Sequence, residues 1–259
     1  MDYVVSKVLI DLYKNIENND VFKDEAISLE KLLDIIKKYM EKQNPVYTVI
    51  EQTTLKTSVI TKTYYPKGTF KVYIEHNDIY ATLELMIALM MTRNKGIFIV
   101  DENIGVVNSL IKIINKLAEK EIFSMNDNIS FFDEILCVGS KKFYNEILNF
   151  SYKDIIYFGY GEYDVYLTEQ FENKQEKIKD DPNYNIYINI SLSEALVKMN
   201  EFGSNFTSAI FTKDENEVKY FIEKCNSKNI YINMFPSKKC YLDLDLNNFV
   251  KIQNIIISK

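Results

Sequence analysis

Histidine and cysteine, the side chains on which nucleophilic triads and dyads commonly depend, are scarce in this sequence. His76 is the single histidine among 259 residues. A Ser-His-Asp or Cys-His arrangement would have to use it, and no nucleophile is tied to it by spacing. We therefore expect His76 to be a surface or capping residue. The three cysteines, Cys137, Cys225 and Cys240, show no metal-ligand spacing and no activating neighbour. The sequence thus predicts no catalytic residue and no metal site, with Cys137 as a buried structural thiol.

Two glycine-containing turns are the candidates for binding a ligand. Gly139-Ser140 follows a predicted strand and opens a predicted helix, so its backbone amides would lie at a helix N-terminus, where phosphates bind. A tight turn in which Ser140 is the helix N-cap explains the same residues. Gly159-Tyr160-Gly161 lies between two predicted strands, where it is either a ligand approach or a simple turn. Gly139, Ser140, Gly159 and Gly161 are the predicted remnants of a cofactor site, although the GxGxxG fingerprint of dinucleotide sites is absent.

The elements that position these turns follow from hydrophobic periodicity. Apolar residues recur at helical spacing over 4–18 and 26–40, and alternation over 47–51 and 55–65 predicts strands. Short apolar strands then alternate with helices, an order that predicts an open parallel sheet of Rossmann-like α/β type. The predicted strands of this region are 70–75, 96–100, 134–138, 154–157 and 164–167, and its helices are 79–92, 104–120 and 141–149.

A polar stretch over 169–185 interrupts this alternation, and we predict a linker there. Beyond it lies a smaller βαβ-like unit over 186–239, in which Ser193 and Asp214 are suitable helix N-caps. Its predicted strands are 186–190, 208–211 and 230–233, and its helices are 193–200 and 215–224. Residues 240–259 alternate as LDLDL and end in IQNIII, which predicts one or two closing strands. The predicted domains are therefore 1–168, the linker 169–185, 186–239, and the closing strands 240–259.

Charge and composition exclude several classes of partner. The formal charge is −6. Binding to nucleic acid or to an anionic membrane requires a basic surface, so neither partner is expected. The longest apolar stretch is too short to span a bilayer, and the first residues do not resemble a signal peptide. The sequence therefore predicts a soluble cytoplasmic protein.

The order of these segments resembles the aldehyde dehydrogenase superfamily. The stretch YYPKGTFKVYIEHNDIYATLELMIALMMTRNKGIFIV is similar to the start of its cofactor domain, and ILCVGSKKFYNEIL to its Gly-Ser turn and following helix. The stretches IIYFGYGEYDVYLTE and SLSEALVKMNEFGSNFTSAIFTKDENEVKYFIEKCNSKNIYINMFPS resemble the glutamate-5-semialdehyde dehydrogenase (gamma-glutamyl phosphate reductase) family. The residues of the last match that are in register together are Glu194, Ala195, Gly203, Ser204, Ala209, Ile210, Thr212 and Asn233.

The departures from that resemblance concern catalysis and the cofactor. In the family, a long segment with the nucleophilic cysteine follows the strand that corresponds to 164–167. In this sequence the segment after 164–167 is the polar stretch 168–185, which contains no cysteine. Asp101 occupies the place of a basic or polar residue, Tyr144 that of a second glycine, and Tyr157 that of a glutamate. The resemblance therefore implies an aldehyde-dehydrogenase-like fold with a reduced second domain, without catalysis and without NAD or NADP.

Three functions are compatible with this sequence. The favoured one is a degenerate, non-catalytic protein with a scaffold, regulatory or ligand-sensing role, whose small-molecule ligand is unknown. The alternatives are an NAD(P)-dependent aldehyde or acyl-phosphate oxidoreductase that uses a displaced thiol, and a module that binds a nucleotide without reacting it. The resemblance also implies that the strands 55–65 and 240–257 join two copies as a homodimer, whereas packing on the chain's own core is the simpler possibility.

Overall fold

The structure is a computed structural model of the 259-residue chain, and it divides into two compact units. The first unit comprises Met1–Leu136, Lys153–Ile155 and Tyr241–Lys259, and the second comprises Cys137–Tyr152 and Ile156–Cys240. The structure describes residues 2–23, 27–126, 131–151, 153–159, 163–181, 183–203, 206–236, 242 and 244–258. Gly161 and Cys240, two residues singled out in the sequence, lie outside the described residues. Within the described residues, no helix is long and apolar enough to cross a membrane.

The first unit begins with a helical layer formed by α1 (Asp2–Glu17), the short 3-10 helix η1 (Asp20–Phe22) and α2 (Leu29–Met40). Both predicted helices are confirmed, with α2 starting at Leu29, where the Ser28 hydroxyl accepts a hydrogen bond from the Lys31 amide. The two helices pack against each other. They do so because apolar side chains at helical spacing are buried on each, namely Leu9, Leu12 and Ile16 on α1 and Leu32, Ile35 and Ile36 on α2.

A five-stranded sheet with the order β5-β4-β3-β6-β7 carries the predicted glycine turns. Pairing of β3 with β4 and of β4 with β5 is parallel, as predicted for an open α/β sheet. The three-residue strand β5 was not predicted, because so short a run has no readable period. The division between the two units passes through β6 and β7. The members of this region are β3 (Thr69–Ile74), α3 (Ile79–Met91), β4 (Lys95–Ile99), α4 (Ile104–Leu117), β5 (Phe123–Met125), β6 (Glu134–Gly139), α5 (Lys141–Leu148) and β7 (Ile155–Gly159), with the 3-10 turn η2 (Glu75–Asn77) after β3.

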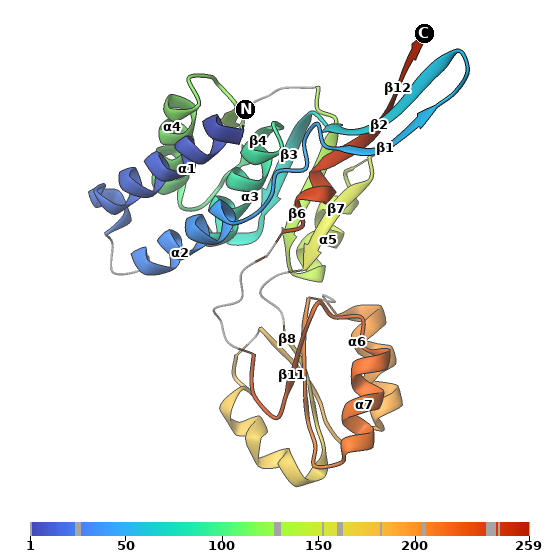
Figure 1. The fold of residues 1–259 in the computed structure, drawn as a ribbon. Coiled ribbons are helices and arrows are strands. Elements are labelled where there is room, and N and C mark those ends of the chain that lie inside the picture. Colours follow the sequence, from blue (N-terminus) through green and yellow to red (C-terminus); the bar gives the residue numbers. More distant parts are fainter. Residues whose placement is uncertain are drawn as a thin grey trace. The chain divides into compact units, whose positions relative to one another are not determined.

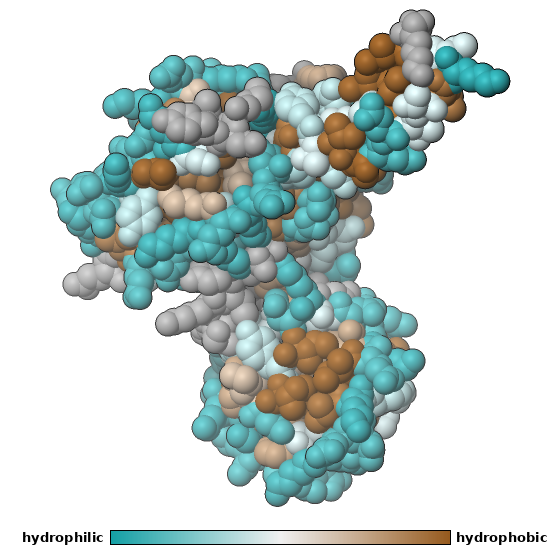
Figure 2. Space-filling model, viewed as in Figure 1, coloured by the Kyte–Doolittle hydropathy of each residue, from teal (hydrophilic) through white to brown (hydrophobic). Residues whose placement is uncertain are grey.

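An antiparallel arm of three strands, β1 (Val49–Thr54), β2 (Ser58–Pro66) and β12 (Val250–Ser258), also belongs to the first unit (Figure 1). β12 runs along β2 from the pair Val250–Pro66 to the pair Ser258–Ser58, so the two ends of the sequence meet in one sheet. The expectation that the LDLDL run forms part of a closing strand is wrong, since Leu242 and Leu244 are buried and β12 begins only after the 3-10 helix η4 (Leu246–Phe249). Apolar surface gathers along the arm (Figure 2).

The second unit contains a parallel sheet with the order β11-β10-β8-β9. Each face of this sheet is covered by its own apolar cluster. One cluster joins Tyr166 and Ile210 to helices α6 and α7, and the other joins Val165 and Phe211 to the segment that follows β8. The elements are β8 (Tyr163–Leu167), the 3-10 helix η3 (Glu169–Lys177), β9 (Tyr184–Tyr187), α6 (Leu192–Phe202), β10 (Thr207–Phe211), α7 (Glu215–Lys224) and β11 (Asn229–Ile232).

The structure corrects the predicted linker over 169–185. This stretch forms η3 and leads directly into β9, which pairs with β8 inside the second sheet. It is a crossover rather than a linker because its few apolar residues, Phe171, Ile178 and Tyr184, belong to the apolar cluster on one face of the sheet. β8 therefore belongs to the second unit and not to a first domain that ends at residue 168. Ser191, and not Ser193, is the N-cap of α6, whereas Asp214 caps α7 as predicted.

Candidate functional site

The predicted Gly-Ser turn lies at the end of β6 and opens α5. Gly139 closes the strand, and the Ser140 hydroxyl accepts a hydrogen bond from the Phe143 amide at 3.2 Å. Ser140 is thus the N-cap of α5, as one of the two interpretations of this turn predicted. Gly159 ends β7, the neighbour of β6 in the sheet, so the structure brings the two predicted glycine turns to adjacent strands. Their role in binding a ligand stays a prediction.

Two tyrosines and a lysine gather beside this turn. The rings of Tyr144 and Tyr157 lie 4.5 Å apart between centroids, and the Tyr157 hydroxyl donates to the Gly139 carbonyl at 3.1 Å. The Lys141 ammonium lies 4.6 Å from the Tyr144 ring centroid and 5.4 Å from that of Tyr157, both within the range of a cation–π contact. Lys141, Tyr144 and Tyr157 therefore form one group of contacts next to the turn.

Sequence reasoning noted Tyr144 and Tyr157 separately and missed that they meet. Lys141 and Tyr144 are three residues apart on α5, a spacing that places them on one helix face and was readable from the sequence. Tyr157 comes from another strand, and nothing local in the sequence indicated that it faces Tyr144. The contact follows from the pairing of elements in the sheet, so only the structure reveals it.

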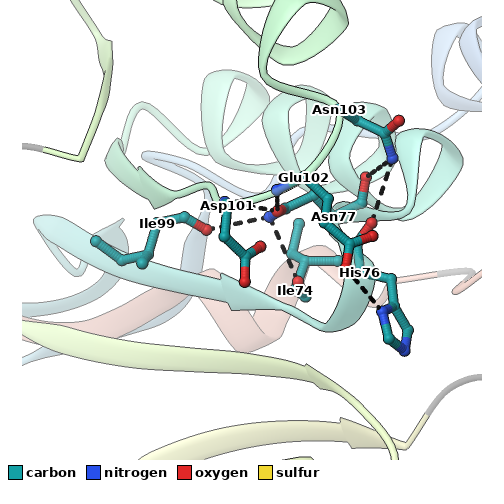
Figure 3. A network of polar contacts seen from close by, with 7 residues as sticks. All are labelled: Ile74, His76, Asn77, Ile99, Asp101, Glu102 and Asn103. Carbon is teal, nitrogen blue, oxygen red and sulfur yellow. Dashed lines mark hydrogen bonds and ion pairs between the residues drawn. The ribbon is translucent and has the colours of Figure 1, made fainter.

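A second polar cluster lies where β3 and β4 end, at one edge of their parallel pair (Figure 3). The buried Asn77 side chain joins the two strands. Its amide nitrogen donates to the Ile74 carbonyl at 3.4 Å and to the Ile99 carbonyl at 3.1 Å. Its amide oxygen accepts from the backbone amides of Asp101 and Glu102 at 3.0 and 2.9 Å. Asn77 thus fixes the turn after β4, and sequence reasoning did not identify this residue.

Acidic groups surround the only histidine in this cluster. His76 Nδ1 lies 3.2 Å from a Glu102 carboxylate oxygen, and the imidazole is largely exposed, as predicted for a surface histidine. The hydrogen bond with Glu102, together with the charges of Glu102, Glu75 and Asp101, raises the pKa of His76 above its ordinary value of 6.5, against a smaller opposing effect of burial. His76, Asn77 and Asn103 all have positive φ, near 50°, so the backbone here is held in the left-handed region.

Two of the three cysteines, Cys137 and Cys225, are described by the structure, and neither forms a disulfide. Cys137 is inside β6 with no exposed surface, which confirms the predicted buried thiol. Cys225 is the C-cap of α7 and packs against the apolar cluster beneath α6 and α7. The segment between β8 and β9, where a catalytic thiol would be expected from the sequence resemblance, has no cysteine. Among the described residues, no group of three or more His, Cys, Asp or Glu side chains is arranged to hold a metal ion.

Aromatic and acidic side chains lie beside the turns at which the sequence resemblance would place a dinucleotide. The Gly-Ser turn that would hold its phosphates is beside the Tyr144–Tyr157 pair, and the edge formed by β3 and β4 is acidic at Asp101 and Glu102. Carboxylates repel a pyrophosphate, and the aromatic pair is held in place by a hydrogen bond to the turn itself.

No family model matches this sequence, and no curated protein matches it either. Solved structures do match. Gamma-glutamyl phosphate reductase from Thermotoga maritima superposes with a TM-score of 0.66 at 9% identity, covering 100% of this chain and 94% of that one. Aldehyde dehydrogenase 21 from Physcomitrella patens superposes with a TM-score of 0.70 at 11% identity, covering 99% and 85%. Gamma-glutamyl phosphate reductase from Saccharomyces cerevisiae gives 0.54 at 13% identity, covering 99% and 92%. The predicted aldehyde-dehydrogenase-like fold is confirmed.

Proposed function

We propose that this chain, which has the fold of the aldehyde dehydrogenases, is a non-catalytic protein with a scaffold, regulatory or ligand-sensing role. The observation that carries the proposal is the direct crossover from β8 through η3 to β9, which contains no cysteine. Oxidation of an aldehyde on this fold would need a thiolate that forms a covalent intermediate. Cys137, sealed inside β6, is not accessible to a substrate.

The arrangement at the Gly139 turn supports the loss of the cofactor as well. Tyr144, Tyr157 and Lys141 are in mutual contact at the place where phosphates would approach the helix N-terminus. Displacing Tyr157 would break its hydrogen bond to the Gly139 carbonyl and its contact with Tyr144. We therefore expect NAD and NADP to bind no more tightly than millimolar.

The test combines an activity assay with a binding assay on the purified full-length protein. We expect no NAD(P)-dependent turnover of glutamate-5-semialdehyde or simple aldehydes, and no heat of binding for NADH or NADPH below millimolar concentrations. Micromolar affinity for either nucleotide without turnover would contradict the expected loss of the cofactor and favour a nucleotide-binding module.

The fold itself favours one alternative, an NAD(P)-dependent oxidoreductase of aldehydes or acyl phosphates that uses a displaced thiol. Cys225 and Cys240 are then the candidates, because Cys137 is buried. Turnover that disappears in Cys225→Ser or Cys240→Ser, and persists in Cys137→Ser, would establish this alternative and refute the non-catalytic role.

A further inference from the structure

A cavity of about 710 Å³ lies at the carboxyl edge of the second unit's sheet. Its walls come from the three segments that follow β8, β9 and β10, represented by Glu169, Asn189 and Lys213. A volume of this size is within the range of small-molecule sites.

The topology of the sheet places this cavity at a switch point. β8 and β10 are neighbours, but β8 continues through η3 to β9 on one side, whereas β10 continues through α7 to β11 on the other. η3 and α7 pack on opposite faces of the sheet (Figure 1). The two connections therefore diverge at the carboxyl ends of adjacent parallel strands, which is where open α/β sheets hold their ligands.

Three hydroxyl groups of the lining donate their protons to other groups of the protein. Thr168 Oγ1 donates to the Phe211 carbonyl at 2.9 Å, and the Tyr166 hydroxyl donates to the Ile190 carbonyl at 3.3 Å. Thr212 Oγ1 donates to the Glu217 carboxylate. Because these protons are already engaged, the oxygens of Thr168 and Tyr166 offer lone pairs to a ligand, whereas Thr212 Oγ1 also accepts from the Asp214 amide at 3.0 Å.

The charges of the lining also favour a ligand that donates hydrogen bonds and carries positive charge. Four carboxylates face one ammonium group in this cavity: they are Glu169, Glu194, Asp214 and Glu217, against Lys213. The N-termini of α6 and α7 carry negative charge of their own, since Glu194 lies in the first turn of α6, Asp214 caps α7 and Glu217 lies in the first turn of α7. Burial, and then the charges of Glu217 and Glu169, raise the pKa of Tyr166, which also lines the cavity. The negative charge of both carboxylates is therefore felt inside the cavity.

We propose that this cavity binds a small organic cation, an aliphatic amine or polyamine whose ammonium hydrogens meet the carboxylates and hydroxyl oxygens. A ligand of this class supplies hydrogen-bond donors and positive charge to a lining in which carboxylates outnumber the single ammonium of Lys213. The proposal goes beyond the non-catalytic role and does not depend on it, since the cavity is separate from the Gly139 turn and from the Asn77 cluster.

Calorimetric titration of the full-length protein with spermidine tests this proposal. We expect a dissociation constant in the micromolar range at low salt that weakens as salt is raised, and no binding of inorganic phosphate. Glu217→Gln and Glu169→Gln should each weaken binding about tenfold, because each removes one charge-assisted contact while keeping the side-chain shape.

Matched controls carry the same change on the same elements outside the cavity. Glu172→Gln on η3 and Glu223→Gln on α7 remove one exposed carboxylate each and should leave the affinity for spermidine within twofold. If the control and cavity variants weaken spermidine binding equally, spermidine is attracted by the net negative charge of the protein and not by this cavity. That result would overturn the proposal. Absence of binding at millimolar spermidine, or tighter binding of phosphate, would overturn it as well.

Discussion

At the scale of single residues, Asn77 determines the geometry of the cluster between β3 and β4. Its buried amide makes four hydrogen bonds to backbone groups of two strand ends. Alanine would leave two backbone amides and two carbonyls to find other partners in a place that water reaches poorly. The turn after β4 would then lose the side chain that holds it.

We therefore expect Asn77→Ala to lower the free energy of unfolding by about 3 kcal/mol, measured by urea denaturation. Asn216→Ala, at an exposed position on α7, is the control and should change stability by no more than about 0.5 kcal/mol. A loss below about 1 kcal/mol in Asn77→Ala would show that water replaces the amide without penalty.

His76 provides a pH-dependent probe of the same cluster. Its pKa is raised in the folded protein, chiefly by Glu102, so the protonated form is favoured by folding. The stabilisation from this pair is therefore complete below the ordinary pKa of 6.5 and is lost as the pH rises through the folded pKa. Because the imidazole is largely exposed, the effect is small, below about 1 kcal/mol.

The single histidine gives one unambiguous imidazole signal in a proton NMR titration. We expect a midpoint above 6.5 in the native protein and a lower midpoint in Glu102→Gln. The stability difference between native protein and His76→Gln should also be larger at pH 5.5 than at pH 8.5. A midpoint unchanged by Glu102→Gln would remove Glu102 as the cause.

At the scale of elements, the arm exposes apolar side chains along its edge strand. On β12, Ile252, Ile256 and Ile257 are each more than half exposed, and Val49 on β1 is too. The leucines expected to share this role, Leu242, Leu244 and Leu246, are instead buried. The predicted contact between two copies therefore rests on the strands of the arm alone, and apolar edges of this kind favour pairing with another strand.

We predict a homodimer joined through the arm, detected by light scattering at micromolar concentration. Ile256→Lys places a charge on the edge strand and should raise the dissociation constant at least about tenfold. Ile222→Lys, at a half-exposed position on α7, should leave the dimer intact. A particle with the mass of one chain, unchanged when the native protein is concentrated, would rule the prediction out.

At the scale of the whole molecule, the chain's last segment returns to the first unit. The Leu244 amide donates to the Tyr39 hydroxyl at 3.3 Å, and Lys42 donates to the Leu244 carbonyl at 2.8 Å. Asn94 donates to the Phe249 carbonyl at 2.7 Å, and the fully buried Phe249 ring lies 5.8 Å from that of Phe70. Residues more than 150 positions apart thus complete one core.

We expect Phe249→Ala to destabilise the first unit by about 4 kcal/mol, because it removes a large buried ring and leaves a cavity. Thermal unfolding followed by circular dichroism would measure the loss. Phe131→Ala, whose ring is 75% exposed in the same unit, should have little effect. Equal stability of the Phe249 variant and the native protein would mean that the returning segment is not part of the cooperative core.

Local pattern alone predicted most elements of this fold. Helix α7 has the predicted bounds, and β6 and α3 differ from them by one residue, because each has a clear period or a continuous apolar run. The order of these segments also indicated the superfamily fold that the solved structures confirm. Of the candidate site, the sequence identified Gly139, Ser140 and the buried Cys137, whose roles depend on immediate neighbours along the chain.

What the sequence determined by itself is therefore what depends on spacing within one element: the helix faces, the N-caps Ser140 and Asp214, and the absence of a cysteine after β8. The tertiary structure alone decided which strands share a sheet. It placed η3 and β9 in the second unit, because the apolar side chains of this polar stretch pack on a sheet face that β8 and β10 form together. It also brought Tyr157 against Tyr144 and the last segment against α2, since contacts between distant segments depend on packing that no local period encodes.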